Sequence, residues 1–237
     1  MKNTKQSLIR IPNGYDKCRY AFFPGIELCA SAPEQAVLSY DAIVQQHPDS
    51  AIFISEPDSE TLRNEWAAIG KPIIITANSS DTLLLSQSLP EARIESLYEK
   101  FAEWNIFGSC VHDRYNMTGE DKNVNHALKA LLETMGAKIE ENAADDSLPI
   151  LTYDMKTRNA LLADGRDAYY AMELFFGGSS EEESEHNHDS EHDHESHPQK
   201  QLRSPAECRA ALCTDNDREQ NISDVIETIQ NLFFSEI

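Results

Sequence analysis

Short apolar runs alternate with amphipathic helical patterns along the first part of the chain. Runs of β-prone apolar residues bounded by turn-forming residues predict buried strands at 19–23, 51–54, 73–76 and 92–97. Apolar side chains at helical spacing predict helices at 32–46, from Ser59 to Gly70, at 81–88 with Ser79 or Ser80 as the cap, and up to Trp104. Strands that alternate with helices are typical of an α/β fold.

The alternation continues in shorter form up to Gly178. We expect a strand that ends at His112, and then, in order, a helix at 123–136, strands at 138–140 and 148–153, a helix at 157–163 and a closing segment at 168–176. The pattern predicts two tandem Rossmann-like α/β halves with mostly parallel strands, residues 1–108 and 109–178. In such sheets, ligands bind beyond the carboxyl ends of the strands.

The composition changes sharply after this region. Residues 181–197 contain eight carboxylates, five histidines and no Lys or Arg, so they cannot form an apolar core. We predict a disordered acidic His-rich linker at 179–203, followed by C-terminal helices at 204–237. In the last helix, an apolar stripe is expected to pack on the α/β body or on a partner; it consists of Ile222, Val225, Ile226, Ile229, Leu232 and Phe233.

The overall charge and composition argue against some classes of binding partner. A formal net charge of −21 and a pI near 4.6 argue against nucleic-acid binding, which needs a basic surface. No apolar run approaches the roughly 20 residues of a membrane span. The acidity permits cation binding or docking to a basic protein partner. The five cysteines are sparse, odd in number and include no C-x-x-C pair, which favours reduced thiols in a cytoplasmic protein.

The turns that follow the predicted strands carry a recurring order of short motifs over residues 18–178. The motifs are Phe23-Pro24-Gly25-Ile26, Ile54-Ser55-Glu56-Pro57, Thr76-Ala77-Asn78-Ser79, His112-Asp113-Arg114-Tyr115, Tyr153-Asp154-Met155-Lys156-Thr157 and Glu173-Leu174-Phe175-Phe176-Gly177. In this order they resemble the cysteine-rich (CCG-domain) iron–sulfur proteins, which include the heterodisulfide reductase B subunit. The resemblance implies an α/β scaffold whose turns once supplied cluster ligands.

The cluster ligands of that family are missing here. An iron–sulfur cluster is held by thiolates, whereas the matching positions of this chain are Ile26, Ser55, Glu56, Thr76, Ser79, Tyr115, Asp154 and Thr157. The second Cys-Cys-Gly segment of the family would fall at 141–150, where no trace of it remains. The resemblance therefore implies a degenerate copy of the scaffold, without an iron–sulfur cluster.

A few residues near the predicted strand ends have reactive or metal-binding side chains. Cys29 and Cys110 are interpreted as core thiols, with a redox-active pair across the site as the alternative. His112 beside Asp113 has the composition of a general base or a metal ligand pair, but no nucleophile or third ligand stands with it. His126 is expected on a helix surface.

Acidic residues near the strand ends have two interpretations. Glu56, Asp58 and Asp154 are interpreted as a solvated acidic rim, with a hard-cation site at the edge of the sheet as the alternative.

The histidine-rich segment is a second candidate site. Neutral imidazoles among carboxylates suit Zn²⁺ and Ni²⁺, and the potential ligands are His186, His188, His192, His194 and His197. The alternative is a solvated acidic linker that keeps two parts of the protein apart and binds metal in vitro without a physiological role.

Three functions remain open from the sequence. The first is a non-catalytic partner-binding or accessory subunit of a redox system. The second is a metal-binding accessory protein that acts through the His-rich tract. The third is a redox enzyme that uses a repurposed pocket.

Overall fold

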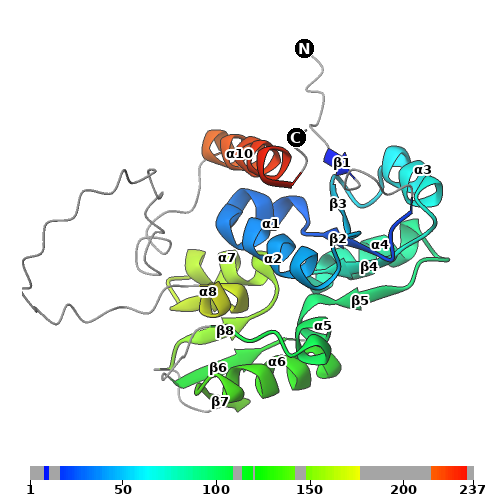
Figure 1. Ribbon diagram of the computed structural model, residues 1–237. Coiled ribbons are helices and arrows are strands. Elements are labelled where there is room, and N and C mark those ends of the chain that lie inside the picture. Colours follow the sequence, from blue (N-terminus) through cyan, green and yellow to red (C-terminus); the bar gives the residue numbers. More distant parts are fainter. Residues whose placement is uncertain are drawn as a thin grey trace, which may run out of the picture.

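The computed structural model describes residues 8–10, 17–108, 114–119, 121–141, 148–176 and 215–233. These residues form a mixed α/β structure with two sheets of mostly parallel strands and a C-terminal helix (Figure 1). The predicted fold class is confirmed at this level. The predicted linker at 179–203 and the first of the predicted C-terminal helices lie outside the described residues.

The first sheet has five strands in the order β1-β3-β2-β4-β5. Their bounds are Leu8–Arg10, Tyr20–Phe23, Ala51–Ile54, Ile73–Thr76 and Ile94–Ser96 for β1 to β5. Only β1 is antiparallel to its neighbour, and the pairs β2–β3, β2–β4 and β4–β5 are parallel. Parallel strands covered on both faces consist of continuous apolar residues, which explains why the sequence pattern found β2, β3 and β4 correctly.

Five helices accompany this sheet. They are α1 at Ile26–Ser31, α2 at Pro33–Gln46, α3 at Glu60–Ala68, α4 at Ser79–Ser88 and α5 at Leu97–Trp104. The Ser59 hydroxyl caps α3 by accepting from the backbone N–H of Leu62 at 3.5 Å, as predicted. The sequence missed α1, which begins directly after Gly25, and it placed the start of α4 too late, because Asn78 and not Ser79 or Ser80 is the N-cap.

The second sheet has four parallel strands in the order β7-β6-β8-β9. The strands are β6 at Arg114–Thr118, β7 at Lys138–Glu141, β8 at Ile150–Thr152 and β9 at Ala168–Tyr170; the helices are α6 at Lys122–Thr134, α7 at Met155–Ala163 and α8 at Ala171–Phe176. The prediction missed β6, where it expected a turn. Only Tyr115 and Met117 of β6 are buried, so the polar residues between them concealed a half-buried strand.

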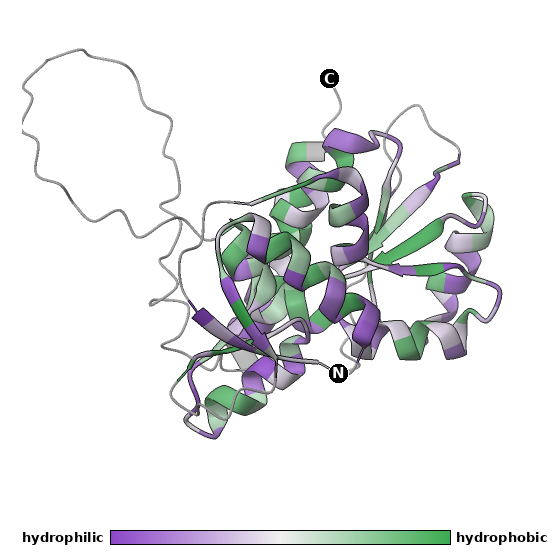
Figure 2. Ribbon diagram, turned by 90° about the horizontal axis from the view of Figure 1, so that it is seen from below, coloured by the Kyte–Doolittle hydropathy of each residue, from purple (hydrophilic) through white to green (hydrophobic). Residues whose placement is uncertain are grey.

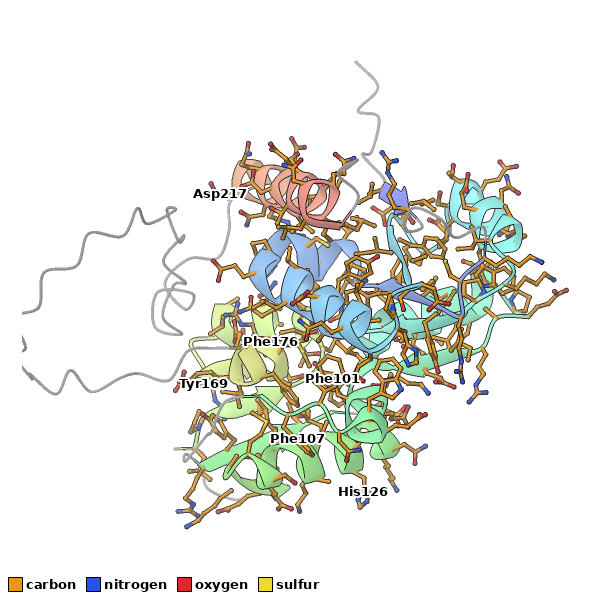
Figure 3. All side chains as sticks on the ribbon, viewed as in Figure 1. Phe101, Phe107, His126, Tyr169, Phe176 and Asp217 are labelled. Carbon is orange, nitrogen blue, oxygen red and sulfur yellow. The ribbon has the colours of Figure 1, made fainter. Side chains whose placement is uncertain are left out.

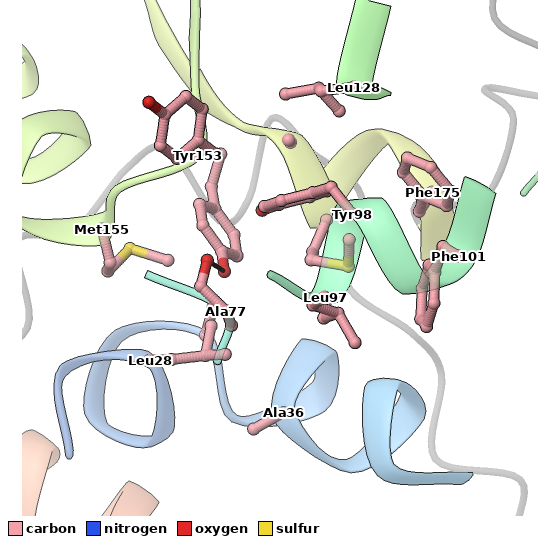
Figure 4. Close-up of a cluster of buried hydrophobic side chains, with 14 of the residues drawn as sticks. Leu28, Ala36, Ala77, Leu97, Tyr98, Phe101, Leu128, Tyr153, Met155 and Phe175 are labelled. Atoms are coloured by element: carbon pink, nitrogen blue, oxygen red, sulfur yellow. Dashed lines mark hydrogen bonds between the residues drawn. The ribbon is translucent and has the colours of Figure 1, made fainter. Parts of the chain in front are cut away.

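One hydrophobic core joins the two sheets. It contains Leu28 of α1, Tyr98 and Phe101 of α5, Leu128 of α6 and Tyr153, which follows β8 (Figure 4). Figure 2 shows helices striped in green and purple, the pattern of helices that bury one face. The two sheets are therefore fixed to one another through a shared apolar interior.

The opposite face of the first sheet has a core of its own. Phe23 and Phe53 project from the strands and pack with Trp66 of α3 and Leu85 of α4. This cluster is separate from the core that joins the two sheets. Within the described part of the chain, no helix is both long and apolar enough to span a membrane.

Helix α10, at Asp215–Phe233, lies across α1 and α2 (Figure 1). Its Val225 and Ile229 are 1% and 0% exposed in the core. Arg218 donates to both carboxylate oxygens of Glu27, at 2.6 and 3.0 Å, and Asn221 donates from Nδ2 to the carbonyl oxygen of Ala30 at 2.7 Å. Four residues of the predicted apolar stripe, Ile222, Val225, Ile226 and Ile229, therefore pack on the α/β body of the same chain. Leu232 is exposed, which the prediction did not expect, and the Phe233 side chain lies outside the described residues.

We predict that Ile229→Ala weakens the attachment of α10. Truncating a fully buried Ile removes apolar contacts and leaves a cavity, at a cost of about 2 to 5 kcal/mol. Limited proteolysis should then cleave within α10 much faster than in the parent protein. Leu232→Ala is the matched control, because this side chain on the same helix is 65% exposed and its truncation should leave the cleavage rate nearly unchanged.

Candidate functional site

Two strand-to-helix turns, one from each sheet, meet between the sheets. The first follows β4 and leads into α4, and the second follows β8 and leads into α7. Strands β4 and β8 hold the same place in their sheets, each beside the first parallel strand of its sheet, where the strand order reverses. The carboxyl ends of strands at such a reversal are where ligands bind in open α/β sheets.

Asn78 links three segments at this meeting point. Its Nδ2 donates to the carbonyl oxygen of Pro24 at 3.1 Å and to Oδ2 of Asp81 at 2.9 Å. Its Oδ1 accepts from the backbone N–H of Met155, the first residue of α7, at 3.3 Å. The side chain is 3% exposed, so these bonds satisfy a buried amide.

Asp154 makes the reciprocal connection. Its Oδ1 accepts from the backbone N–H and the hydroxyl of Thr157, at 3.0 and 3.2 Å. Its Oδ2 accepts from the backbone N–H of Ser80 at 3.3 Å and from the hydroxyl of Ser79 at 3.4 Å. Burial alone would raise the pKa of Asp154, but the hydrogen bonds from Thr157 and Ser80 outweigh it and lower the pKa below its ordinary value.

Each of the two N-cap residues therefore also accepts a hydrogen bond from the first turn of the other residue's helix. Asn78, the N-cap of α4, accepts from the first turn of α7, and Asp154, the N-cap of α7, accepts from the first turn of α4. Helix N-termini present unpaired N–H donors and a partial positive charge. A single carboxylate between two such termini joins the sheets by electrostatics as well as by packing.

Asp81 lies beside this network in a crowded position. It is 7% exposed, and a Cβ placed on Gly25 would lie only 2.0 Å from its Oδ2. Gly25 also has a φ of +77°, so both the space and the backbone conformation require glycine there. Burial raises the pKa of Asp81 to about 6, because it outweighs the hydrogen bond from Asn78 and the nearby charge of Lys156.

An open cavity of about 290 Å³ adjoins the network, and Asn78 and Ser79 belong to both. Helix α4, the ends of β4 and β5 and the start of α6 enclose it. Its polar lining includes Thr76, Ser79, Thr82, Ser96, Glu99 and Asp121. Thr76 and Thr82 are hydrogen-bonded to each other through their hydroxyls at 2.7 Å.

The structure brings together some of the residues that match the cluster positions. Ser79, Asp154 and Thr157 form one hydrogen-bonded group, and Thr76 lines the adjoining cavity. Ser55 and Glu56 follow β3, on the side of β2 away from β4.

Two other positions differ from the expected arrangement. Ile26 begins α1 and packs against the core. Tyr115 lies inside β6, packed edge-on against Tyr169 at 5.5 Å, so the expectation of a turn at that position is wrong.

The described cysteines are buried. Cys29 lies within α1, not in a turn before the helix as expected, and it is 0% exposed. Burial, with a smaller contribution from the charge of Asp81, raises the pKa of the Cys29 thiol far above its ordinary value. Burial likewise raises the pKa of Cys18 to about 11. Thiols of this kind are poor nucleophiles.

Several candidates lie outside the described residues. They are Cys110, His112, Asp113 and the five histidines of the acidic tract, His186, His188, His192, His194 and His197. His126 is exposed on α6, as expected (Figure 3). Within the described segments, no group of three or more His, Cys, Asp or Glu residues is arranged to hold a metal ion, so Glu56 and Asp58 form no such site with Asp154.

The sequence interpretation missed Asn78 and Asp81. The motif order indicates Asn78 only as part of a turn, although Asn immediately before a helical run is a favoured N-cap. No sequence signal indicates that Asp81 is buried. Its position depends on the close approach of Gly25, which only the folded structure provides.

No protein-family model, curated protein or solved structure matches the chain, so the functional conclusions depend on its own residues and geometry.

We predict that Asp81→Asn stabilises the protein at neutral pH. The carboxyl pKa of about 6 is above its ordinary value of 3.8, so the native state binds this proton more tightly than the unfolded state. Ionisation of Asp81 therefore lowers stability as the pH rises from about 4 to above 6. A shift of this size corresponds to roughly 1 to 3 kcal/mol.

Urea unfolding at several pH values between 4 and 8 measures this effect. The free energy of unfolding of the variant should exceed that of the parent at pH 7, and the two values should converge near pH 4. Asp58→Asn is the control, since that side chain is exposed and its removal should leave the pH dependence unchanged. A loss of stability at pH 7 in Asp81→Asn would contradict the assignment.

Proposed function

We propose that the chain is a degenerate member of the cysteine-rich (CCG-domain) iron–sulfur family, similar to the heterodisulfide reductase B subunit. In this proposal it holds no iron–sulfur cluster and acts as a non-catalytic partner-binding or accessory subunit of a redox system. The motif order in the sequence suggests the family, and the geometry between the two sheets suggests the loss of the cluster.

The topology supports two Rossmann-like repeats. When the parallel strands of each sheet are numbered along the chain, β3-β2-β4-β5 and β7-β6-β8-β9 both have the order 2-1-3-4. The helix after the last strand also begins alike in both. Glu99 accepts from the backbone N–H of Ser96 at 3.4 Å, and Glu173 accepts from that of Tyr170 at 2.8 Å. Such matched details favour an internal repeat.

The observation that carries the proposal is the direct contact among Ser79, Asp154 and Thr157. These residues stand where the resemblance places cluster cysteines, and Asp154 accepts a hydrogen bond from the hydroxyl of each of the other two. Iron–sulfur clusters need thiolate ligands, and a buried carboxylate that accepts four hydrogen bonds is already satisfied. In this proposal, the hydrogen bonds of these side chains join the two sheets where a cluster would otherwise lie.

We predict that anaerobically purified protein contains no stoichiometric iron or acid-labile sulfide. Its visible spectrum should lack the absorption near about 400 nm that iron–sulfur clusters show. Iron, sulfide and protein assays on the same gel-filtered sample measure this directly. The proposal fails if a brown sample carries iron in a fixed ratio to the chain through gel filtration.

The acidic histidine tract supports a second function, a Zn²⁺- or Ni²⁺-binding accessory protein. Five imidazoles among eight carboxylates suit these ions. We predict micromolar binding in the full chain by calorimetry, which should weaken below about pH 6 as the imidazoles are protonated.

Two variants test this second function. Deletion of residues 181–197 should abolish the binding, and replacement of the five histidines by Gln, which keeps the length of the tract and its carboxylates, should do the same. Unchanged binding in the Gln variant would remove this function.

The third alternative, a redox enzyme with a repurposed pocket, gains no support from Cys29. Its thiol is fully buried and has a raised pKa, which disfavours the thiolate that redox chemistry needs.

A further inference from the structure

The cavity beside α4 presents acceptors, because most of its hydroxyl protons are already used. The Ser79 hydroxyl donates to Asp154 at 3.4 Å. The Thr82 hydroxyl donates to the carbonyl oxygen of Asn78 at 3.2 Å, and the Ser86 hydroxyl donates to that of Thr82 at 2.7 Å. Since Thr82 donates to Asn78, Thr76 is the donor in the Thr76–Thr82 pair. The hydroxyl oxygens thus offer lone pairs to a ligand.

Two carboxylates add negative charge to this lining. Asp121 caps α6 through Oδ1, which accepts from the backbone N–H groups of Asn123 and Val124 at 2.8 and 3.3 Å. Glu99 accepts from Ser96 through Oε2. These hydrogen bonds use one oxygen of each carboxylate. No Lys, Arg or His is found among the described residues that line the cavity, so the positive charge beside the two carboxylates is the partial charge of the helix N-termini that they cap.

The remaining walls are apolar. Ala77, Leu83, Ile94 and Val124 line the cavity together with the polar groups. Leu83 is 62% exposed and its neighbour Leu84 is 40% exposed, which gives α4 an apolar rim outside the cavity. A volume of about 290 Å³ is at the small end of ligand pockets, which typically have about 300 to 1,000 Å³. The lining therefore suits a short aliphatic chain that ends in a group with several N–H donors.

We propose that this cavity binds the side chain of a lysine presented by a protein partner. The ammonium group has three donors and no acceptor, which complements the lone pairs and the two carboxylates. The methylene stem fits against Leu83 and Val124. The exposed leucines of α4 favour a protein as the source of the amine, because they offer apolar contact that a free amine does not use. The inference rests on the proposed function, in which the chain binds a partner.

The test uses the full chain, labelled for NMR, and the synthetic peptide acetyl-Leu-Lys-Leu-amide as the probe. Titration should shift the resonances of Leu83, Val124 and Glu99. The same peptide acetylated at the lysine Nζ should bind at least about tenfold more weakly, because acetylation removes the charge. n-Butylamine should also bind more weakly than the lysine peptide, because it lacks the contacts with the rim.

Three variants locate the site. Glu99→Gln and Asp121→Asn should each raise the dissociation constant of the lysine peptide about fivefold, and Asn remains a good N-cap for α6. Glu133→Gln is the matched control: it removes one charge from an exposed position at the other end of α6 and should leave binding unchanged.

Each contrary result has a definite meaning. Equal binding of the acetylated peptide, or unchanged binding in both carboxylate variants, overturns the site. Binding of n-butylamine as tight as that of the peptide overturns the assignment to a partner lysine and indicates a free amine. The iron assay tests the proposed function separately. If the protein holds a cluster but binds the lysine peptide, only the proposed function is contradicted. If it holds no cluster and does not bind the peptide, only this inference is contradicted.

Discussion

The carboxylate of Asp154 between the N-termini of α4 and α7 is the interaction on which the arrangement of the two sheets depends. Four donors from two helices converge on its two oxygens, and the positive ends of both helix dipoles face it. Asn78 makes the reciprocal contact, because its Oδ1 accepts from the backbone N–H of Met155 at the start of α7. Because the hydrogen bonds fix both turns, they also fix the cavity, whose walls come from α4, α5 and α6.

The same region shows how side-chain hydrogen bonds join two turns that come from different sheets. The carboxylate of Asp154 is satisfied by the hydroxyls of Ser79 and Thr157 together with two backbone N–H groups. Asp81 is the exception. Its buried carboxyl receives one hydrogen bond, from Asn78, and lies against the backbone of Gly25. Its pKa is raised because burial away from water disfavours the charged carboxylate.

Helix α10 is tied into the same framework through Glu27. This carboxylate accepts from Arg218 of α10 and from Asn159 of α7, at 2.6 and 2.9 Å, so one side chain of α1 contacts two elements that are far apart in the sequence. Burial would raise the pKa of Glu27, but the hydrogen bond and charge of Arg218 lower it below its ordinary value. Helix α10, at the end of the described chain, therefore stabilises α1, which begins directly after Gly25.

The sequence by itself determined the α/β class and most elements, because buried parallel strands are continuously apolar and amphipathic helices repeat every 3.6 residues. It also determined the lack of thiolates at the matching positions. It failed at β6, whose two inward residues are too few to mark a strand, and at Tyr115 within it. Only the tertiary structure decided that Asn78 and Asp154 cap each other's helices and that Asp81 is buried. These contacts join residues more than 70 positions apart or depend on a glycine's backbone conformation, and no local pattern encodes either.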